Sequence, residues 1–196
     1  MSLDILNLEC NILSCSRCKG LNILKETMSA QGYGSYSAKL LVVGQSLHSY
    51  NPDTPDKQIP FIGPVKRLDS GVILYEALEK AGYTKETYFI TNIVKCHPPD
   101  NRKSTKTEIL NCKSYLEDEI KLIKPITILT LGSNARDWFN LDPVRQGYVS
   151  VQYKKATEYI AIQKFVVAYH PSYIRRYGMK YKDKYIKQIV NAIRIK

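Results

Sequence analysis

Four short apolar runs along the chain have the length and composition of buried β-strands. They cover residues 39–43, 88–94, 126–131 and 165–169, and each is bounded by polar residues or glycine. The segments between these runs show the helical spacing of apolar residues. This alternation is typical of a parallel sheet covered by helices on both sides. We therefore expect an α/β fold with a parallel four-stranded sheet.

Apolar residues at helical spacing also place the helices around these strands. The expected helices cover residues 2–18, 69–81, 107–123, 133–139 and 180–196. Gly82 and Pro125 mark the ends of two of them, and Ser133 is expected to cap another. Residues 147–161 predict two further strands around a polar turn, and residues 20–37 predict an irregular loop.

The ends of the four strands carry most of the candidate chemistry. In a parallel sheet the carboxyl ends of the strands lie at one edge, where ligands bind. Here those ends read Gly44-Gln45, Thr91-Asn92, Leu131-Gly132 and Tyr169-His170. A glycine turn, an amide and an imidazole are therefore expected to meet at a single edge of the sheet.

Length, charge and apolar content limit the classes of protein that need to be considered. The 196 residues contain no repeat, low-complexity tract or linker, so we expect one domain over residues 1–196. Lys and Arg number 29 against 18 Asp and Glu, a net charge of +11, which suits a polyanionic partner and, on charge alone, equally suits a merely soluble lysine-rich protein. The first ten residues lack a signal-peptide pattern, and no run reaches the ~18 apolar residues of a membrane helix. We expect an intracellular, cytoplasmic, soluble protein that does not bind a membrane and is a monomer.

The five cysteines include two separated pairs. Cys15 and Cys18 form a C-x2-C turn, whereas Cys96 and Cys112 are separated by fifteen residues. In a reducing compartment such thiols are metal ligands or free thiols rather than disulfides. Four thiolates suit zinc or a [4Fe–4S] cluster, and the spacing alone does not choose between them. Cys10 is interpreted as a spare thiol of the core.

Seven motifs, taken in order, resemble family 4 of the uracil-DNA glycosylases, the iron–sulfur group. They are the cysteine turn of residues 14–18, GYGSYSAKLLVVG at 32–44, PFIG at 60–63, TNIVKCHPPDNR at 91–102, residues 108–112, TLG at 130–132 and HPSY at 170–173, followed by Arg175 and Arg176. The resemblance covers most of the chain. It implies a three-layer α/β/α sandwich around the parallel four-stranded sheet.

The resemblance also implies an activity and a cofactor. The activity is hydrolysis of the N-glycosidic bond of uracil in single- or double-stranded DNA, by a monofunctional glycosylase of base-excision repair. The cofactor is a structural [4Fe–4S] cluster, rather than zinc, bound by Cys15, Cys18, Cys96 and Cys112.

Five residues are assigned to the pocket on this resemblance. A glycosylase turns its base out of the helix and holds it in a fitted pocket. Phe61 stacks on the uracil, and Asn92 binds the uracil edge, because an amide offers both a donor and an acceptor. His170 donates to uracil O2 as negative charge develops on the leaving base. Gly44 allows close approach of the backbone, and Ser46 is grouped with it as a substrate-binding residue.

The residues expected on the DNA side are basic or follow His170. They are Lys95, Arg102, Lys103, Lys106, Ser172, Tyr173, Arg175 and Arg176, with Tyr173 and Ile174 as candidates for the wedge that fills the gap left by the flipped base. The pocket residues and the DNA-side residues also have ordinary interpretations. Phe61 fits a core, Asn92 fits a strand cap, and exposed basic residues can simply be solvated.

The first active-site motif departs from the family. Family 4 has an acidic residue after the glycine, whereas this chain has Gln45 there. Three explanations remain open. In the first, Gln45 positions water while His170 stabilises the leaving base. In the second, Asp53 or Asp56 reaches the site from the long loop of residues 45–63, which also holds His48. In the third, the protein binds DNA, or another damaged base, with little uracil excision.

Two further alternatives fit the sequence less well. One is a relative that forms a covalent intermediate through the histidine after the Asn92 strand, but His97 stands directly beside Cys96. The other is a zinc-stapled α/β protein with a small-molecule pocket.

Overall fold

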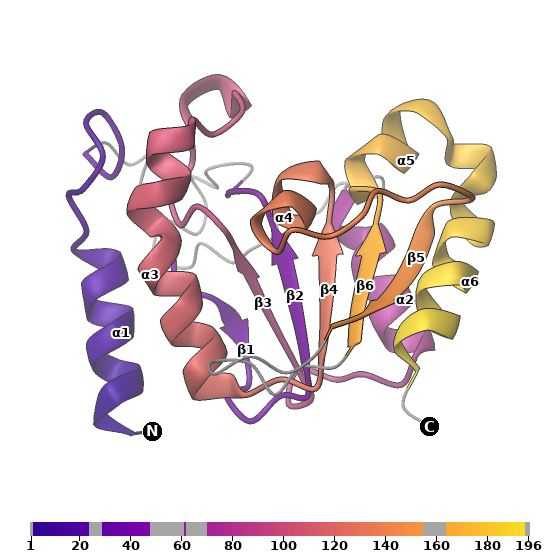
Figure 1. The fold of residues 1–196 in the computed structure, drawn as a ribbon, viewed down its shortest axis with the longest axis horizontal. Helices are drawn as coiled ribbons and strands as arrows, with labels where there is room; N and C mark the ends of the chain where they lie inside the picture. The colour runs from indigo at the N-terminus through magenta and orange to yellow at the C-terminus, as the bar shows by residue number, and fades with distance from the viewer. Residues whose placement is uncertain (1, 24–28, 48–60, 62–69, 155–163, 195–196) are drawn as a thin grey trace.

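A mixed six-stranded sheet forms the centre of the molecule (Figure 1). The structure is a computed structural model, which describes residues 2–23, 29–47, 61, 70–154 and 164–194. The strands are β1 (Tyr33–Gly34), β2 (Leu40–Gly44), β3 (Tyr88–Asn92), β4 (Thr127–Leu131), β5 (Val149–Tyr153) and β6 (Lys164–Ala168), in the order β1-β3-β2-β4-β6-β5.

The four inner strands are the parallel sheet that the apolar runs predict. β3, β2, β4 and β6 pair in parallel, and every residue of β2, β3 and β4 is buried. β1 and β5 add to the two edges in antiparallel orientation. β5 confirms the first of the two strands expected within residues 147–161, and the second lies outside the described residues.

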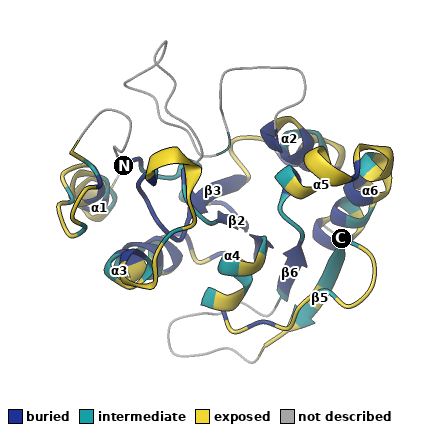
Figure 2. Cartoon of the chain, turned by 90° about the horizontal axis from the view of Figure 1, so that it is seen from above, coloured by how far each residue is buried: buried dark blue, intermediate teal, exposed yellow. Residues whose placement is uncertain are grey.

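Helices cover both faces of the sheet, as expected for a three-layer sandwich (Figures 1 and 2). One face carries α1 (Leu3–Leu13), α3 (Lys106–Ile123) and α4 (Ser133–Trp138), and the other carries α2 (Ser70–Lys80), α5 (Pro171–Tyr177) and α6 (Lys182–Ile193). Alternate residues of β2 serve the two layers: Leu41 and Val43 face the first, and Leu40 and Val42 the second. None of the described helices is long and apolar enough to cross a membrane.

Several details differ from the sequence expectations or add to them. Gly132, not Ser133, occupies the N-cap of α4, and no side chain caps that helix. The segment after His170 is a helix, α5, and the irregular segment of residues 20–37 contributes the two-residue strand β1. Cys10 is exposed rather than a thiol of the core.

Candidate active site and cysteine cluster

Gly44 and Asn92 lie side by side at the carboxyl ends of β2 and β3. A side chain at position 44 would collide with this arrangement, because a Cβ there would lie 2.5 Å from Asn92 Oδ1 and 2.6 Å from Phe61 Cζ. Gly44 therefore leaves room for both groups at one point. The structure thus brings together three of the residues expected in the pocket.

The side-chain oxygen of Asn92 is a buried hydrogen-bond acceptor. The residue is 3% exposed, and among the described residues Oδ1 has no hydrogen-bond partner. A buried polar atom without a partner costs about 1–3 kcal/mol, so such atoms usually await a ligand or a water molecule. The position of Asn92 Oδ1 against Gly44 and Phe61 makes this atom an acceptor for a planar ligand with an N–H donor at its edge.

Phe61 is held in an unusual backbone conformation. Its φ is +64°, a left-handed value that bulky residues rarely adopt. Its carbonyl oxygen packs so closely on Gly71, in the first turn of α2, that a Cβ at position 71 would overlap it. The ring lies 5.5 Å from the ring of His170, with 28° between their planes. Phe61 and His170 therefore form an aromatic pair beside Asn92.

Hydrogen bonds orient the imidazole of His170, which begins α5 as its N-cap. Nδ1 accepts the backbone N–H of Ser172 at 3.2 Å and lies 2.7 Å from Ser172 Oγ. Because Nδ1 is an acceptor there, the proton of the neutral ring resides on Nε2. A donor on Nε2 is what the expected role of His170 requires. Ser172 thus orients this ring, and its expected contact with DNA stays a prediction.

Gln45 has a partner that the sequence analysis does not identify. Asn134 Nδ2, at the start of α4, donates to Gln45 Oε1 at 2.6 Å. The carbonyl end of the Gln45 side chain is thus used within the protein. Gln45 and Ser46 are both half-buried. The only sequence signal for Asn134 is its place just after the end of β4.

Lys95 lies in the core rather than on a DNA surface, which corrects the sequence expectation. Its side chain is 2% exposed, and Nζ donates to Thr91 Oγ1 at 2.7 Å, to the Asn92 carbonyl at 2.9 Å and to Glu119 at 2.6 Å. Glu119 is fully buried in α3, and its other oxygen accepts from Thr91. All three ammonium donors are used, so none remains for a phosphate. Lys95 instead fixes the strand end that carries Asn92.

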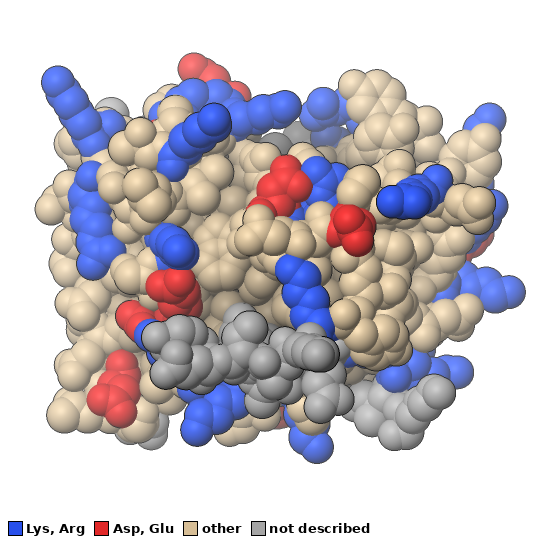
Figure 3. All heavy atoms as spheres, in the orientation of Figure 1, with Lys and Arg blue, Asp and Glu red and all other residues tan. Residues whose placement is uncertain are grey.

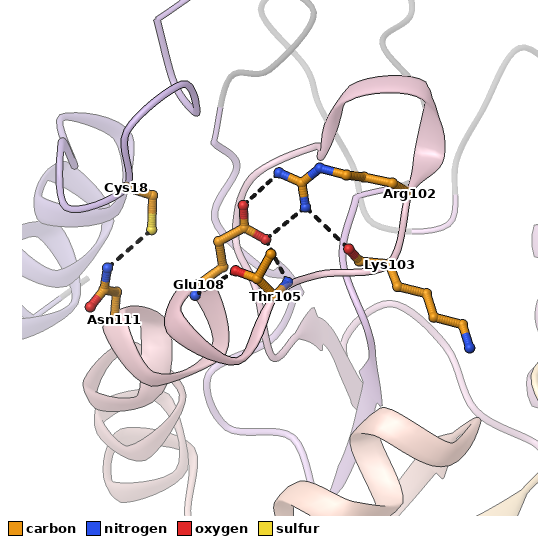
Figure 4. A network of polar contacts seen from close by, with 6 residues as sticks. All are labelled: Cys18, Arg102, Lys103, Thr105, Glu108 and Asn111. Carbon is orange, nitrogen blue, oxygen red and sulfur yellow. Dashed lines mark hydrogen bonds and ion pairs between the residues drawn. The ribbon is translucent and has the colours of Figure 1, made fainter.

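Arg102 holds the loop between the two later cysteines against α3 (Figure 4). Its two terminal nitrogens donate to the two oxygens of Glu108, at 3.0 and 2.6 Å, and this contact is the main reason that the pKa of Glu108 lies below its usual value. Glu108 also completes a capping box with Thr105. Arg102 thus has a structural role, whatever contact its remaining donors make with DNA.

The other basic candidates are on the surface. Lys103, Lys106, Arg175 and Arg176 are exposed, and Tyr173 is 47% exposed, whereas Ile174 is fully buried and cannot act as a wedge. Figure 3 shows Lys and Arg side chains along the upper edge of the molecule, above the strand ends of Figure 1. His48, Asp53 and Asp56 lie outside the described residues, as do Pro60, Ile62 and Gly63 of the PFIG motif.

Four of the five cysteines gather where α1, α3 and the end of β3 meet. Cys96 and Cys112 are buried, and Cys15 and Cys18 pack against the same core. Burial, followed by the nearby Cys112, Cys15 and Cys18, raises the pKa of Cys96 to about 12. Among the described residues, no three His, Cys, Asp or Glu side chains form a group that could hold a metal ion.

Hydrogen-bond donors are directed at these sulfurs. Asn111 Nδ2 lies 3.4 Å from Cys18 Sγ (Figure 4), and the backbone N–H of Lys95 hydrogen-bonds to Cys112. Donors of this kind stabilise metal-bound thiolates and tune the potential of clusters. In its chemistry the donor set, four thiols of which Cys18 and Cys112 have N–H partners, is of the kind that binds a thiolate-ligated metal group.

Comparison with known proteins gives one consistent result. A family model described as the uracil DNA glycosylase superfamily matches residues 31–194. A type-4 uracil-DNA glycosylase of Saccharolobus solfataricus is 34% identical over 65% of this chain and 55% of its own length. Those of Thermotoga maritima and Archaeoglobus fulgidus are 29% and 31% identical, over 78% and 82% of this chain and 74% and 78% of their own lengths. The chain therefore spans about half the length of the first of these relatives and about three quarters of the other two.

Proposed function

The chain belongs to the uracil-DNA glycosylase superfamily and, within it, to the type-4 family, and on that premise we propose that it excises uracil from DNA by hydrolysing the N-glycosidic bond. The observation that carries the proposal is the unpartnered Oδ1 of Asn92 beside Phe61 and Gly44. Uracil has an N3–H donor at its edge and a flat face, so it meets both the acceptor and the aromatic ring.

The same acceptor supports discrimination between uracil and cytosine. Asn92 Oδ1 accepts from N3–H of uracil, and the amide nitrogen of Asn92 donates to O4. Cytosine offers an unprotonated N3 and an amino group at these positions, so both contacts become unfavourable. A site built to hydrogen-bond one pattern rejects the other because its buried polar groups are left unpaired.

His170 supplies the main stabilisation of the leaving base. As the glycosidic bond breaks, negative charge develops on uracil O2, and a donor held at Nε2 of a neutral imidazole stabilises it. Ser172 keeps the proton on that nitrogen by occupying Nδ1. Gln45 can orient the attacking water through its amide N–H, but it cannot accept a proton from that water. We therefore propose that leaving-group stabilisation carries most of the catalysis.

We propose that Cys15, Cys18, Cys96 and Cys112 hold a [4Fe–4S] cluster, in preference to zinc. When bound, the cluster joins the segment after α1 to the loop and helix that follow Asn92, and its chemistry is that of a structural staple. The residues of this chain meet it with the N–H groups of Asn111 and Lys95. A brown colour with broad visible absorbance after anaerobic purification is expected, whereas a colourless protein with stoichiometric zinc contradicts this assignment.

The excision assay uses matched oligonucleotides with uracil, thymine or cytosine at one position, single-stranded and duplex, followed by alkaline cleavage of abasic sites. We expect cleavage only at uracil, and rates at least about 100-fold lower for Asn92→Ala and for His170→Ala, since each removes a group that acts on the leaving base. Lys113→Met, on the exposed face of α3, is the control. Intact uracil oligonucleotides that still bind the wild-type protein would instead support a DNA-binding relative with little activity, which the type-4 relatives do not favour.

A further inference from the structure

A row of tyrosine rings leads from the core to the surface beside His170. The tyrosine row consists of Tyr185, Tyr148, Tyr169, Tyr173 and Tyr177, with neighbouring ring centroids 5.2–6.2 Å apart. Tyr185 is fully buried, and its hydroxyl donates to the Tyr169 carbonyl at 2.7 Å. The inner rings therefore anchor the outer ones in fixed positions.

The two outer rings are exposed and begin at the proposed pocket. Tyr173 is 47% exposed and Tyr177 is 68% exposed. Their ring centroids lie 5.4 Å apart, so the two exposed rings are neighbours on α5. Tyr173 also lines a cavity of about 310 Å³ that His170 and Arg136 border. Large aromatic rings that stay exposed in a contiguous group commonly mark a binding surface. This surface runs outward from the residue that contacts the leaving base.

The charge around the tyrosine row favours a nucleic acid as its partner. Arg175 and Arg176 are exposed on the same short helix, and the Arg176 guanidinium lies 5.9 Å from the centre of the Tyr177 ring. Lys180 lies 4.9 Å from the ring of Tyr181. Residues 164–182 contain no Asp or Glu. Interleaved aromatic and basic side chains bind single strands, because bases stack on the rings while the cations neutralise phosphates.

We propose that Tyr173 and Tyr177 form a stacking platform for unpaired bases adjoining the flipped nucleotide, which makes single-stranded DNA the preferred substrate. Only unpaired and unstacked bases have a free face for these rings, since in a duplex both faces of each base are covered by its neighbours. The proposal rests on the proposed function for placing the reacting base at His170. Binding of a strand to the tyrosine row can be measured without any excision.

The first measurement uses probes that contain no uracil. Fluorescence anisotropy reports the binding of fluorescein-labelled oligothymidylate, and of the same strand annealed to oligoadenylate, to the cluster-bearing protein. We expect Tyr177→Ala to weaken single-strand binding by roughly 5-fold or more, the range measured for single base-stacking aromatics, and duplex binding by less than about 2-fold. Tyr177→Phe keeps the ring and is expected to bind as the wild type does; Tyr177→Leu keeps apolar area without a π face and is expected to resemble Tyr177→Ala.

Tyr153→Ala is the matched control. Tyr153 is 73% exposed and pairs with Lys164, at the opposite end of β6 from His170. The Tyr153→Ala variant should bind the single-stranded and the duplex probe with the same affinity as the wild type. Unchanged single-strand affinity in Tyr177→Ala, equal losses for strand and duplex, or an equal loss in Tyr153→Ala would each overturn the proposal; the first outcome would leave a protein partner as the occupant of the row.

A second measurement separates this proposal from the proposed function. In the excision assay, Tyr177→Ala is expected to raise KM for single-stranded uracil substrate more than for duplex. If the wild type excises nothing but oligothymidylate binding still depends on Tyr177, the glycosylase proposal fails while the platform stands. If uracil is excised efficiently and oligothymidylate binding does not depend on Tyr177, the platform proposal fails while the glycosylase proposal stands.

Discussion

Gln45 and Asn134 share a hydrogen bond between the ends of β2 and β4, and this bond determines which atoms Gln45 can offer to a substrate. Because Oε1 already accepts from Asn134, the amide nitrogen is the group left to act. An amide N–H donates and cannot take a proton from water, whereas a carboxylate accepts. Asn134 is therefore the residue that sets the chemistry available at position 45.

Gln45→Glu tests this argument. Glutamate has nearly the same shape and can still accept from Asn134, and it adds a second carboxylate oxygen that can act as a general base. We expect the single-turnover rate of uracil excision to rise roughly 10-fold or more, within the range that general bases contribute. Asn134→Ala in the Gln45→Glu background should reduce the gain, because the carboxylate loses its orientation. A rate equal to or below that of the wild type would mean that the missing carboxylate does not limit the proposed excision.

Single residues also show where reading the sequence succeeds and where it stops. Asn92 and His170 are predictable because each ends an apolar strand, and parallel strand ends must meet at one edge. Lys95 is mispredicted because charged side chains are rarely buried without a partner, and its partner Glu119 lies on a helix 24 residues further along the chain. Asn134 is missed for the same reason, since its role exists only through a contact made by the folded chain.

At the scale of elements, the buried ion pair of Lys95 and Glu119 joins β3 to α3. Removing one partner from a buried pair leaves the other charge uncompensated, which is far more costly than replacing both by apolar residues. Lys95 also contacts both sites, since Nζ donates to the Asn92 carbonyl and its backbone N–H hydrogen-bonds to Cys112. Loosening it should therefore disturb both the pocket and the cysteine cluster.

Lys95→Met is expected to destabilise the folded protein by about 3–5 kcal/mol, because Glu119, whose pKa burial already raises, loses the cation that compensates its buried charge. The double variant Lys95→Met with Glu119→Leu should recover most of that loss. Thermal unfolding of the cluster-bearing protein gives the ranking. Lys113→Met breaks an exposed pair with Glu117 on the same helix and should cost less than about 1 kcal/mol. A double variant no more stable than Lys95→Met would contradict the claim that the uncompensated charge of Glu119 causes the loss of stability.

The elements themselves are predictable in proportion to their length and apolar content. The four inner strands and α3 have long apolar patterns, so their existence and order follow from the sequence. α5 has only seven residues, of which only Pro171 and Ile174 are buried, and its start depends on the His170 cap, so the sequence shows too little helical periodicity to identify it. β1 has two residues and exists only because β3 offers an edge to pair with.

For the whole molecule, the N-terminal segment is attached to the sheet largely through α3 and the cysteines. Tyr115 Oη donates to the Asn11 carbonyl at 3.0 Å, and Arg17 donates to the Asn111 carbonyl at 3.1 Å. Ser29 Oγ adds a hydrogen bond to the Ile12 carbonyl at 2.8 Å, and Leu8 and Ile12 pack into the core. The proposed cluster would add a further attachment to these contacts.

Cys18→Ser is expected to lose the cluster and to release α1. Without the cluster, no metal group joins the N-terminal cysteine turn to Cys96 and Cys112. Hydrogen exchange of residues 3–13 should speed up, and cleavage by trypsin at Arg17 or Lys19 should become faster. Cys10→Ser, which alters an exposed thiol on the same segment, is the control and should retain colour and protection. Protection of residues 3–13 unchanged in a colourless Cys18→Ser protein would mean that protein contacts alone hold this segment.

The close packing of Gly71 on Phe61 extends the pocket's influence to a helix that contacts no base. Any side chain at position 71 would push the Phe61 carbonyl, and with it the ring, out of line with Asn92 and His170. Val72, the next residue, has an exposed side chain and no such constraint. In a population of random variants selected for repair, position 71 should therefore be almost invariant and position 72 permissive. Tolerance to mutation along α2 would then record the position of an aromatic ring ten residues away.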